Sequence, residues 1–129
     1  ISKAMRLNGI RFLSAVPRAK LIQEQLMAQF HVYPCYYDEL FCIAVAESQI
    51  AGVYPITSEF GALCSTNMGT IINIDPRDSL AKKGFVDTTL SIVEKVHNGE
   101  IDMQAFQQKA LERFHPDTIL KQWDKKVFK

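Results

Sequence analysis

Apolar residues recur along the chain in two spacings. In residues 17–29, apolar positions such as Leu21, Ile22 and Leu26 are separated by polar residues at the interval of an amphipathic helix. In residues 30–35, apolar residues follow one another almost without a break, which is typical of a buried strand. The helices predicted in this way are 17–29, 39–51, 85–97, 102–113 and 117–127. The predicted strands are 10–13, 30–35, 53–58 and 70–74.

The order of these elements predicts the fold class. Strands that alternate with helices indicate parallel βαβ units, so we expect an α/β fold with a Rossmann-like parallel sheet flanked by helices, in one domain over residues 1–129. Ligands of such folds bind outside the carboxyl ends of the strands. Those ends are predicted at Ser14–Pro17, Pro34–Glu39 and Ser58–Ala62.

The length and charge narrow the class of protein. A chain of 129 residues with a net charge of +1 is large enough for a core of its own and has no basic excess that would favour nucleic acid as a partner. The sequence shows neither a signal peptide nor an apolar run long enough for a transmembrane segment. It begins with Ile1 in what resembles the end of a helix, so we expect a fragment of a longer protein.

Three cysteines stand at irregular spacing in apolar surroundings: Cys35, Cys42 and Cys64. We expect buried free thiols, which suit a cytoplasmic protein. The sequence has no Cys-x-x-Cys motif and its three histidines are scattered, so no metal site is expected. His31 lies in an apolar run and is predicted to be a hydrogen-bonded core residue.

The segment "YYDELFCIAVAESQIAG" places a glutamate at each end of a seven-residue apolar run. On a helix over 39–51, Glu39 and Glu47 would lie about 12 Å apart along the axis and about 80° apart around it. Both could therefore face one cleft, and an all-apolar helix between them would be buried. Buried carboxylates need donors, and sugar hydroxyls are suitable ones.

Glu39 would also stand where this helix begins. The backbone N–H groups of Leu40, Phe41, Cys42 and Ile43 would then lack intrahelical acceptors and would form an anion site suited to phosphate. A sugar, a diphosphate and a ribose in series would match this layout. The spacing alone leaves another interpretation open: Glu39 merely favours the helix start, and Glu47 faces solvent or pairs with a lysine.

The surrounding residues resemble the donor-binding half of retaining glycosyltransferases of the GT-B fold, which carry a Glu-x7-Glu motif (group 1 glycosyltransferases). The family pattern is a strand ending in Pro and a small residue, two glutamates on a helix, an Ala-x-Gly stop, a Pro-Val-Ile strand and a Gly-Gly turn. The corresponding stretch here is "FHVYPCYYDELFCIAVAESQIAGVYPITSEFGAL", and "ALERFHPDTILKQWDKKV" resembles the final helices of the family. The resemblance covers nearly the whole chain.

The resemblance implies transfer of a hexose from a nucleotide-diphosphate sugar to an acceptor hydroxyl, with retention of configuration and no metal ion. It implies that Glu39 contacts the transferred sugar and that Glu47 holds the ribose. The amides that follow Glu39, those of Leu40, Phe41, Cys42 and Ile43, would hold the diphosphate. The base would approach Ser14, Ala15, Val16 and Arg18, although Arg18 also suits the surface. Tyr37 would shape the sugar pocket, whereas packing is favoured for Tyr36 and Trp123.

The acceptor, a hydroxyl of a sugar, lipid or protein, would be bound by an amino-terminal domain that this chain lacks. The fragment alone is therefore expected to be inactive, and the full-length protein to be cytoplasmic or peripheral to a membrane. One departure from the family pattern favours a non-catalytic glycosyltransferase-like module as the alternative: the Gly-Gly-x-x-Glu turn reads "GALCS" and lacks the Glu. The phosphate-clamping Arg and Lys also have no counterpart, which we expect because the chain would begin after the βα unit that carries them. An unrelated doubly wound binding domain is a further alternative.

Overall fold

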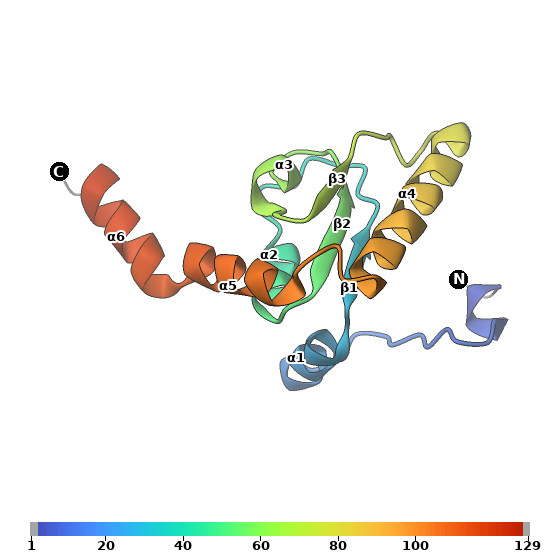
Figure 1. Ribbon diagram of the computed structural model, residues 1–129, viewed down its shortest axis with the longest axis horizontal. Helices are drawn as coiled ribbons and strands as arrows, with labels where there is room; N and C mark the ends of the chain where they lie inside the picture. The colour runs from blue at the N-terminus through green and yellow to red at the C-terminus, as the bar shows by residue number, and fades with distance from the viewer. Residues whose placement is uncertain (1–2, 128–129) are drawn as a thin grey trace.

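A three-stranded parallel sheet forms the centre of the protein. The computed structural model describes residues 3–127 (Figure 1). The strands lie in the order β1-β2-β3, with bounds β1 (Phe30–Tyr33), β2 (Tyr54–Ser58) and β3 (Thr70–Ile72). Phe30 lies opposite Tyr54, and Ile56 lies opposite Thr70. The predicted α/β class, with a parallel sheet flanked by helices, is confirmed to this extent.

Six α-helices and one short 3-10 helix are found among residues 3–127. They are η1 (Ala4–Arg6), α1 (Arg18–Met27), α2 (Ile43–Ile50), α3 (Leu63–Thr66), α4 (Ser79–His97), α5 (Met103–Phe114) and α6 (Pro116–Lys126). In Figure 1, α4 lies on one side of the sheet and α2 and α3 lie on the other, while α6 extends away from the sheet beyond α5.

The core has two parts because β2 is covered on both faces. All five residues of β2 are buried, as expected for the central strand of a parallel sheet. On one face Tyr54 and Ile56 pack with Phe85 of α4. On the other face Val45 of α2 packs with Leu63 of α3.

Side-chain caps set the bounds of the carboxyl-terminal helices. The Asp78 side chain accepts a hydrogen bond from the N–H of Leu80, so α4 begins at Ser79, six residues before the predicted start at residue 85. Asp102 caps α5 in the same way through the N–H of Ala105. Such caps satisfy backbone donors that have no acceptor within the helix.

The predicted strand at residues 10–13 is wrong. This segment is extended but forms no strand, and Ile10 and Phe12 are 48% and 53% exposed. A strand requires a hydrogen-bonded neighbour. The recorded side-chain contact of this segment is an ion pair between Arg11 and Glu24 of α1.

The prediction that residues 30–35 form a buried strand is only half correct. The strand exists as β1, but it lies at the edge of the sheet, and Val32 is 44% exposed. An apolar run in the sequence does not reveal whether a strand is central or lies at an edge.

Candidate functional site

The loops after β1 and β2 meet at the carboxyl edge of the sheet, where the topology predicts a ligand site. The N–H of Ala62 donates to the carbonyl oxygen of Glu39 at 2.7 Å. The hydroxyl group of Ser58 donates to the carbonyl oxygen of Cys35. The structure therefore brings two of the predicted segments, Pro34–Glu39 and Ser58–Ala62, together.

Gly61 sets how closely these two loops approach. Its φ is +51°, and a Cβ atom added there would lie 2.6 Å from both the backbone N and O of Glu39. Only glycine fits such a position. The next residue, Ala62, has a φ of −69°, which accommodates a side chain. The Gly-Ala turn therefore needs glycine only at its first position.

Glu39 lies in the loop, not on the helix, so the predicted 39–51 helix is wrong at its amino-terminal end. Helix α2 begins at Ile43, after Cys42, whose φ of 61° places its backbone in the left-handed region. This conformation cannot continue a right-handed helix toward Glu39. The predicted helical separation of Glu39 and Glu47 therefore does not apply.

The carboxylate of Glu39 is held by a tyrosine of β1. The hydroxyl of Tyr33 donates to Glu39 Oε1 at 2.7 Å and lies 2.5 Å from the hydroxyl of Tyr37. Burial raises the pKa of Tyr33 well above its usual value, and the hydrogen bonds to Tyr37 and Glu39 raise it further. Tyr33 was missed by sequence reasoning. Its only signal was its position as the last aromatic residue of the strand.

Free backbone donors follow Glu39. The N–H groups of Val45 and Ala46 both donate to the carbonyl oxygen of Cys42. Within residues 3–127, the N–H groups of Leu40, Phe41, Cys42 and Ile43 donate to no protein acceptor. The four amides predicted to bind an anion are therefore available, although they do not form the first turn of a helix.

The side chains of this segment are not buried, contrary to the prediction. Leu40 is 95% exposed and Ile43 is 64% exposed. Phe41 packs edge-on against Phe114 of α5, with ring centroids 6.3 Å apart. Burial begins at Val45, where α2 meets the sheet and α5.

Glu47 lies on α2 and is paired with Arg18 at the start of α1. Arg18 donates through both terminal nitrogens, at 2.6 Å to Oε1 and 3.3 Å to Oε2. The Arg18 side chain is 66% exposed and that of Glu47 is 27% exposed. The alternative interpretation paired Glu47 with a lysine. Glu47 does pair with a cationic side chain, but that side chain is an arginine. The hydrogen bond to Glu47 raises the pKa of Arg18.

The residues predicted to approach the base lie in the extended segment before α1. Ser14 and Ala15 are exposed and Val16 is half-buried. Arg18, which follows this segment and was predicted with it, is the partner of Glu47. The structure therefore links this part of the predicted site to Glu47 through Arg18.

His31 of β1, which is partly buried, and Ser48 of α2, which is buried, form a polar pair. The Ser48 hydroxyl donates to the carbonyl oxygen of Val45, and its oxygen lies 2.9 Å from Nδ1 of His31. Since that hydroxyl has one proton, Nδ1–H of the imidazole is the donor to Ser48. Burial lowers the pKa of His31. The prediction that His31 is hydrogen-bonded is confirmed, but the residue is only partly buried and lies on the edge strand, outside the two core clusters.

Two aromatic residues for which packing was favoured are exposed instead. Tyr36 is 57% exposed and borders a hollow of about 420 Å³, together with Lys82 and Phe85. Trp123 on α6 is 54% exposed, because this helix extends away from the sheet (Figure 1). Neither residue is the packing anchor that the sequence favoured.

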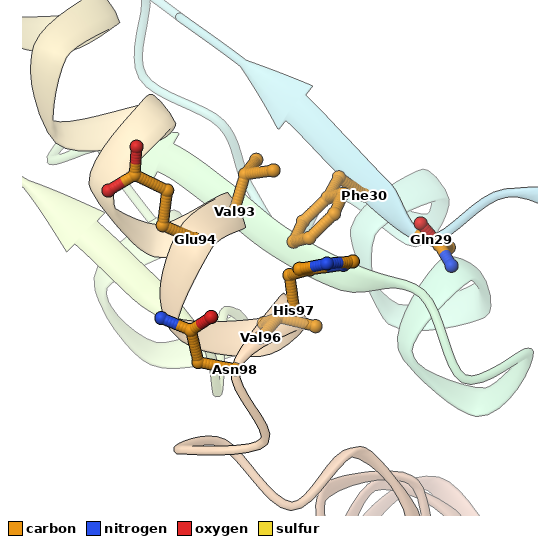
Figure 2. Close-up of a pocket in the computed structure, with 7 residues that line it drawn as sticks. All are labelled: Gln29, Phe30, Val93, Glu94, Val96, His97 and Asn98. Atoms are coloured by element: carbon orange, nitrogen blue, oxygen red, sulfur yellow. The ribbon is translucent and has the colours of Figure 1, made fainter.

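Another hollow, of about 450 Å³, lies between the start of β1 and the end of α4. Figure 2 shows that Phe30 and His97 face it, whereas the carboxylate of Glu94 turns away from it. This hollow is at the amino end of β1, opposite the loops that hold Glu39. It is therefore separate from the candidate site.

The three cysteines are free thiols but differ in exposure. Cys35 is buried, Cys42 is partly buried and Cys64 is exposed, so the prediction of three buried thiols is wrong for Cys64. Burial, with a smaller effect of the nearby Glu39, raises the pKa of Cys42.

Two further classes of site are not seen in the part of the chain that the structure describes. No three side chains of His, Cys, Asp or Glu there gather closely enough to hold a metal ion. None of the helices between residues 3 and 127 is long and apolar enough to cross a membrane.

Comparison with known proteins does not identify a family for this chain. No model of a known protein family matches the chain, and no curated protein matches it significantly.

Proposed function

We propose that this chain is the donor-binding half of a retaining glycosyltransferase of the GT-B fold, and that it binds a nucleotide-diphosphate sugar. The observation that carries the proposal is the site around Glu39. A carboxylate held by Tyr33 stands at the carboxyl edge of a parallel sheet and is followed by four free backbone N–H groups. Ligands of α/β folds bind at this edge, and free amides suit a diphosphate.

The proposed roles follow the chemistry of each group. Hydroxyl groups of the hexose donate to Glu39, and the four amides donate to the diphosphate. The ribose hydroxyls donate to Glu47 and displace Arg18, which is exposed enough to move. Tyr37 lines the sugar pocket, and Ser14, Ala15 and Val16 remain the proposed contacts to the base. An acceptor hydroxyl is supplied through a further domain, and no metal takes part in donor binding.

Calorimetric titration with UDP, GDP and ADP tests the proposal, on this chain and on any longer natural form of the protein. We expect one nucleotide to bind selectively and Glu47→Ala to weaken that binding about tenfold, as loss of a hydrogen-bonded carboxylate implies. Glu100→Ala, which removes an exposed glutamate far along the chain, serves as the matched variant and should bind normally.

Failure of all three nucleotides to bind would overturn the donor-site proposal. It would favour a non-catalytic glycosyltransferase-like module with an assembly or regulatory role. The absence of a glutamate after the Gly61-Ala62 turn is the feature that favours this second function.

A further inference from the structure

A chain of three side chains at the end of β1 leads from the surface to Glu39. Tyr37 is 52% exposed, Tyr33 is half-buried at the last position of β1, and the Glu39 carboxylate follows. The contacts are 2.5 Å between the two hydroxyl oxygens and 2.7 Å from Tyr33 to Glu39 Oε1. The outer end is also fixed through its backbone, because the Cys35 thiol donates to the carbonyl oxygen of Tyr37 at 3.2 Å.

The direction of the hydrogen bonds is determined by the number of protons. A phenol has one O–H, and that of Tyr33 is used on the Glu39 carboxylate. The hydrogen bond between the two tyrosines must therefore be donated by Tyr37. Burial raises the pKa of Tyr33, which keeps this residue protonated and able to donate.

This direction decides what the site can still bind. The only hydroxyl proton of Tyr37 is donated to Tyr33, so the Tyr37 oxygen can only accept a further hydrogen bond. Glu39 Oε2 has no nitrogen or oxygen donor recorded among residues 3–127 and is also an acceptor. A ligand here must supply donors. Hydroxyl groups of a neutral sugar fit, whereas a phosphate or carboxylate would meet oxygen lone pairs and a negative charge.

We propose that Tyr33 is a positioning residue that holds Glu39 as an oriented acceptor and, through Tyr37, makes this end of the site specific for ligand hydroxyl groups. The inference rests on the proposed function and deepens it, because it names the part of a nucleotide sugar that this end reads. Gly61 fixes the backbone of Glu39, and Tyr33 fixes its carboxylate.

The first test compares a nucleoside diphosphate with its glucose conjugate. The nucleotide that binds best among UDP, GDP and ADP is titrated beside UDP-glucose, GDP-glucose or ADP-glucose, respectively. We expect the wild type to prefer the conjugate. Tyr33→Phe should reduce that preference about tenfold and leave affinity for the bare nucleotide unchanged, because it removes a hydrogen bond to a charged group and keeps the ring.

Tyr36→Phe is the matched variant, since it removes a neighbouring phenol hydroxyl that is not part of the chain of hydrogen bonds. It should keep the preference for the conjugate. An unchanged preference in Tyr33→Phe would overturn the inference. Equal losses for nucleotide and conjugate would also overturn it, because they would show that Tyr33 only supports the fold.

The second test does not depend on any ligand. A hydroxyl proton that is hydrogen-bonded and shielded from water exchanges slowly enough to be observed by proton NMR. The contact from Tyr33 to Glu39 is part-buried, whereas that between the two tyrosines is exposed. We therefore expect the Tyr33 hydroxyl signal in the wild type, in Tyr37→Phe and in Tyr36→Phe, and its loss in Tyr33→Phe. If no nucleotide binds, the proposed function fails, and these spectra still decide whether Tyr33 holds the Glu39 carboxylate. Absence of the signal from the wild type would overturn that positioning role.

Discussion

Glu39 and Glu47 stand eight residues apart in one apolar segment, yet they are held in different ways. The position of Glu39 depends on the backbone fit between two loops at Gly61 and on the hydrogen bond from half-buried Tyr33. The position of Glu47 depends on α2, whose inner face is buried, while its own partner, Arg18, is exposed. One carboxylate is therefore sensitive to loop geometry, and the other to the anchoring of a helix. Changes at each place should affect stability unequally.

The largest effect is expected where the loop that carries Glu39 meets Gly61. In Gly61→Ala, the added Cβ would lie 2.6 Å from the Glu39 backbone. The alanine would also have to adopt the left-handed φ of this position. We expect a loss of about 3 kcal/mol in the free energy of unfolding, from the left-handed conformation together with overpacking. Urea unfolding followed by circular dichroism measures this loss.

Gly99→Ala separates the two causes. Gly99 has a φ of +74° but no heavy atom within 4 Å of an added Cβ. Only the conformational cost applies there, about 1 kcal/mol. Equal losses in the two variants would show that the close approach of Gly61 to Glu39 contributes nothing.

The next largest effect is expected on the side of Glu47, where Gln49 anchors α2. Its side chain is fully buried, donates to the carbonyl oxygen of Thr66 at 3.0 Å and accepts from the N–H of Met68 at 2.7 Å. Gln49→Leu would leave the buried carbonyl of Thr66 and the partly buried N–H of Met68 unpaired, and we expect a loss of about 2 kcal/mol in the free energy of unfolding.

Gln108→Leu is the matched substitution, because Gln108 is exposed and its amide donates only to Glu112. Its unfolding free energy should change by less than about 0.5 kcal/mol. If Gln49→Leu were equally mild, the buried amide would not be what anchors α2.

The contact between His31 of β1 and Ser48 of α2 should make the stability of the protein depend on pH. Partial burial lowers the pKa of His31 below its usual 6.5, so the unfolded chain takes up a proton at a pH where the folded protein does not. Stability should therefore fall as the pH drops below about 6.5 and level off below the folded-state pKa. Ser48 and Tyr33 lie close to the imidazole, and Glu24 lines the same hollow as His31.

His31→Gln isolates this contribution, because it keeps a donor for Ser48 and removes the titration. The difference in unfolding free energy between wild type and variant should depend on pH only in this acidic window. A constant difference from pH 5 to pH 8 would show that His31 titrates alike in both states.

The smallest effect is expected from the partner of Glu47. Arg18→Ala removes an exposed ion pair, and such pairs contribute little to stability because water and salt screen them. The urea midpoint should stay within experimental error of that of the wild type. A loss as large as that of Gln49→Leu would contradict the distinction between exposed partner and buried anchor.

The elements that could be predicted from the sequence are those whose residue pattern is local. Helices with clear apolar spacing and the central strand, "VYPITS", are found within a few residues of their predicted bounds. The start of α4 was misplaced because the cap, Asp78, precedes a stretch with weak periodicity. Local pattern and capping chemistry together would have placed it.

What the sequence could not reveal depends on neighbours far along the chain. The apolar run that includes Leu40 and Ile43 looks as buried as the part that begins at Val45, but only the latter has the sheet and α5 against it. The left-handed backbone of Cys42 leaves no reliable signal either. For the same reason Tyr33, which contacts Glu39 across a loop, was not predicted as part of the site.

The graded exposure of the three cysteines supplies a chemical reporter of local opening. Cys64 should react with a thiol reagent at once, whereas Cys35, 1% exposed beside the loop of Glu39, should react only when that loop opens. Mass spectrometry after pulses of alkylation would time this opening without any engineered probe. The rate of alkylation at Cys35, compared with the rate of global unfolding, would show whether the Glu39 loop opens locally or only when the whole domain unfolds.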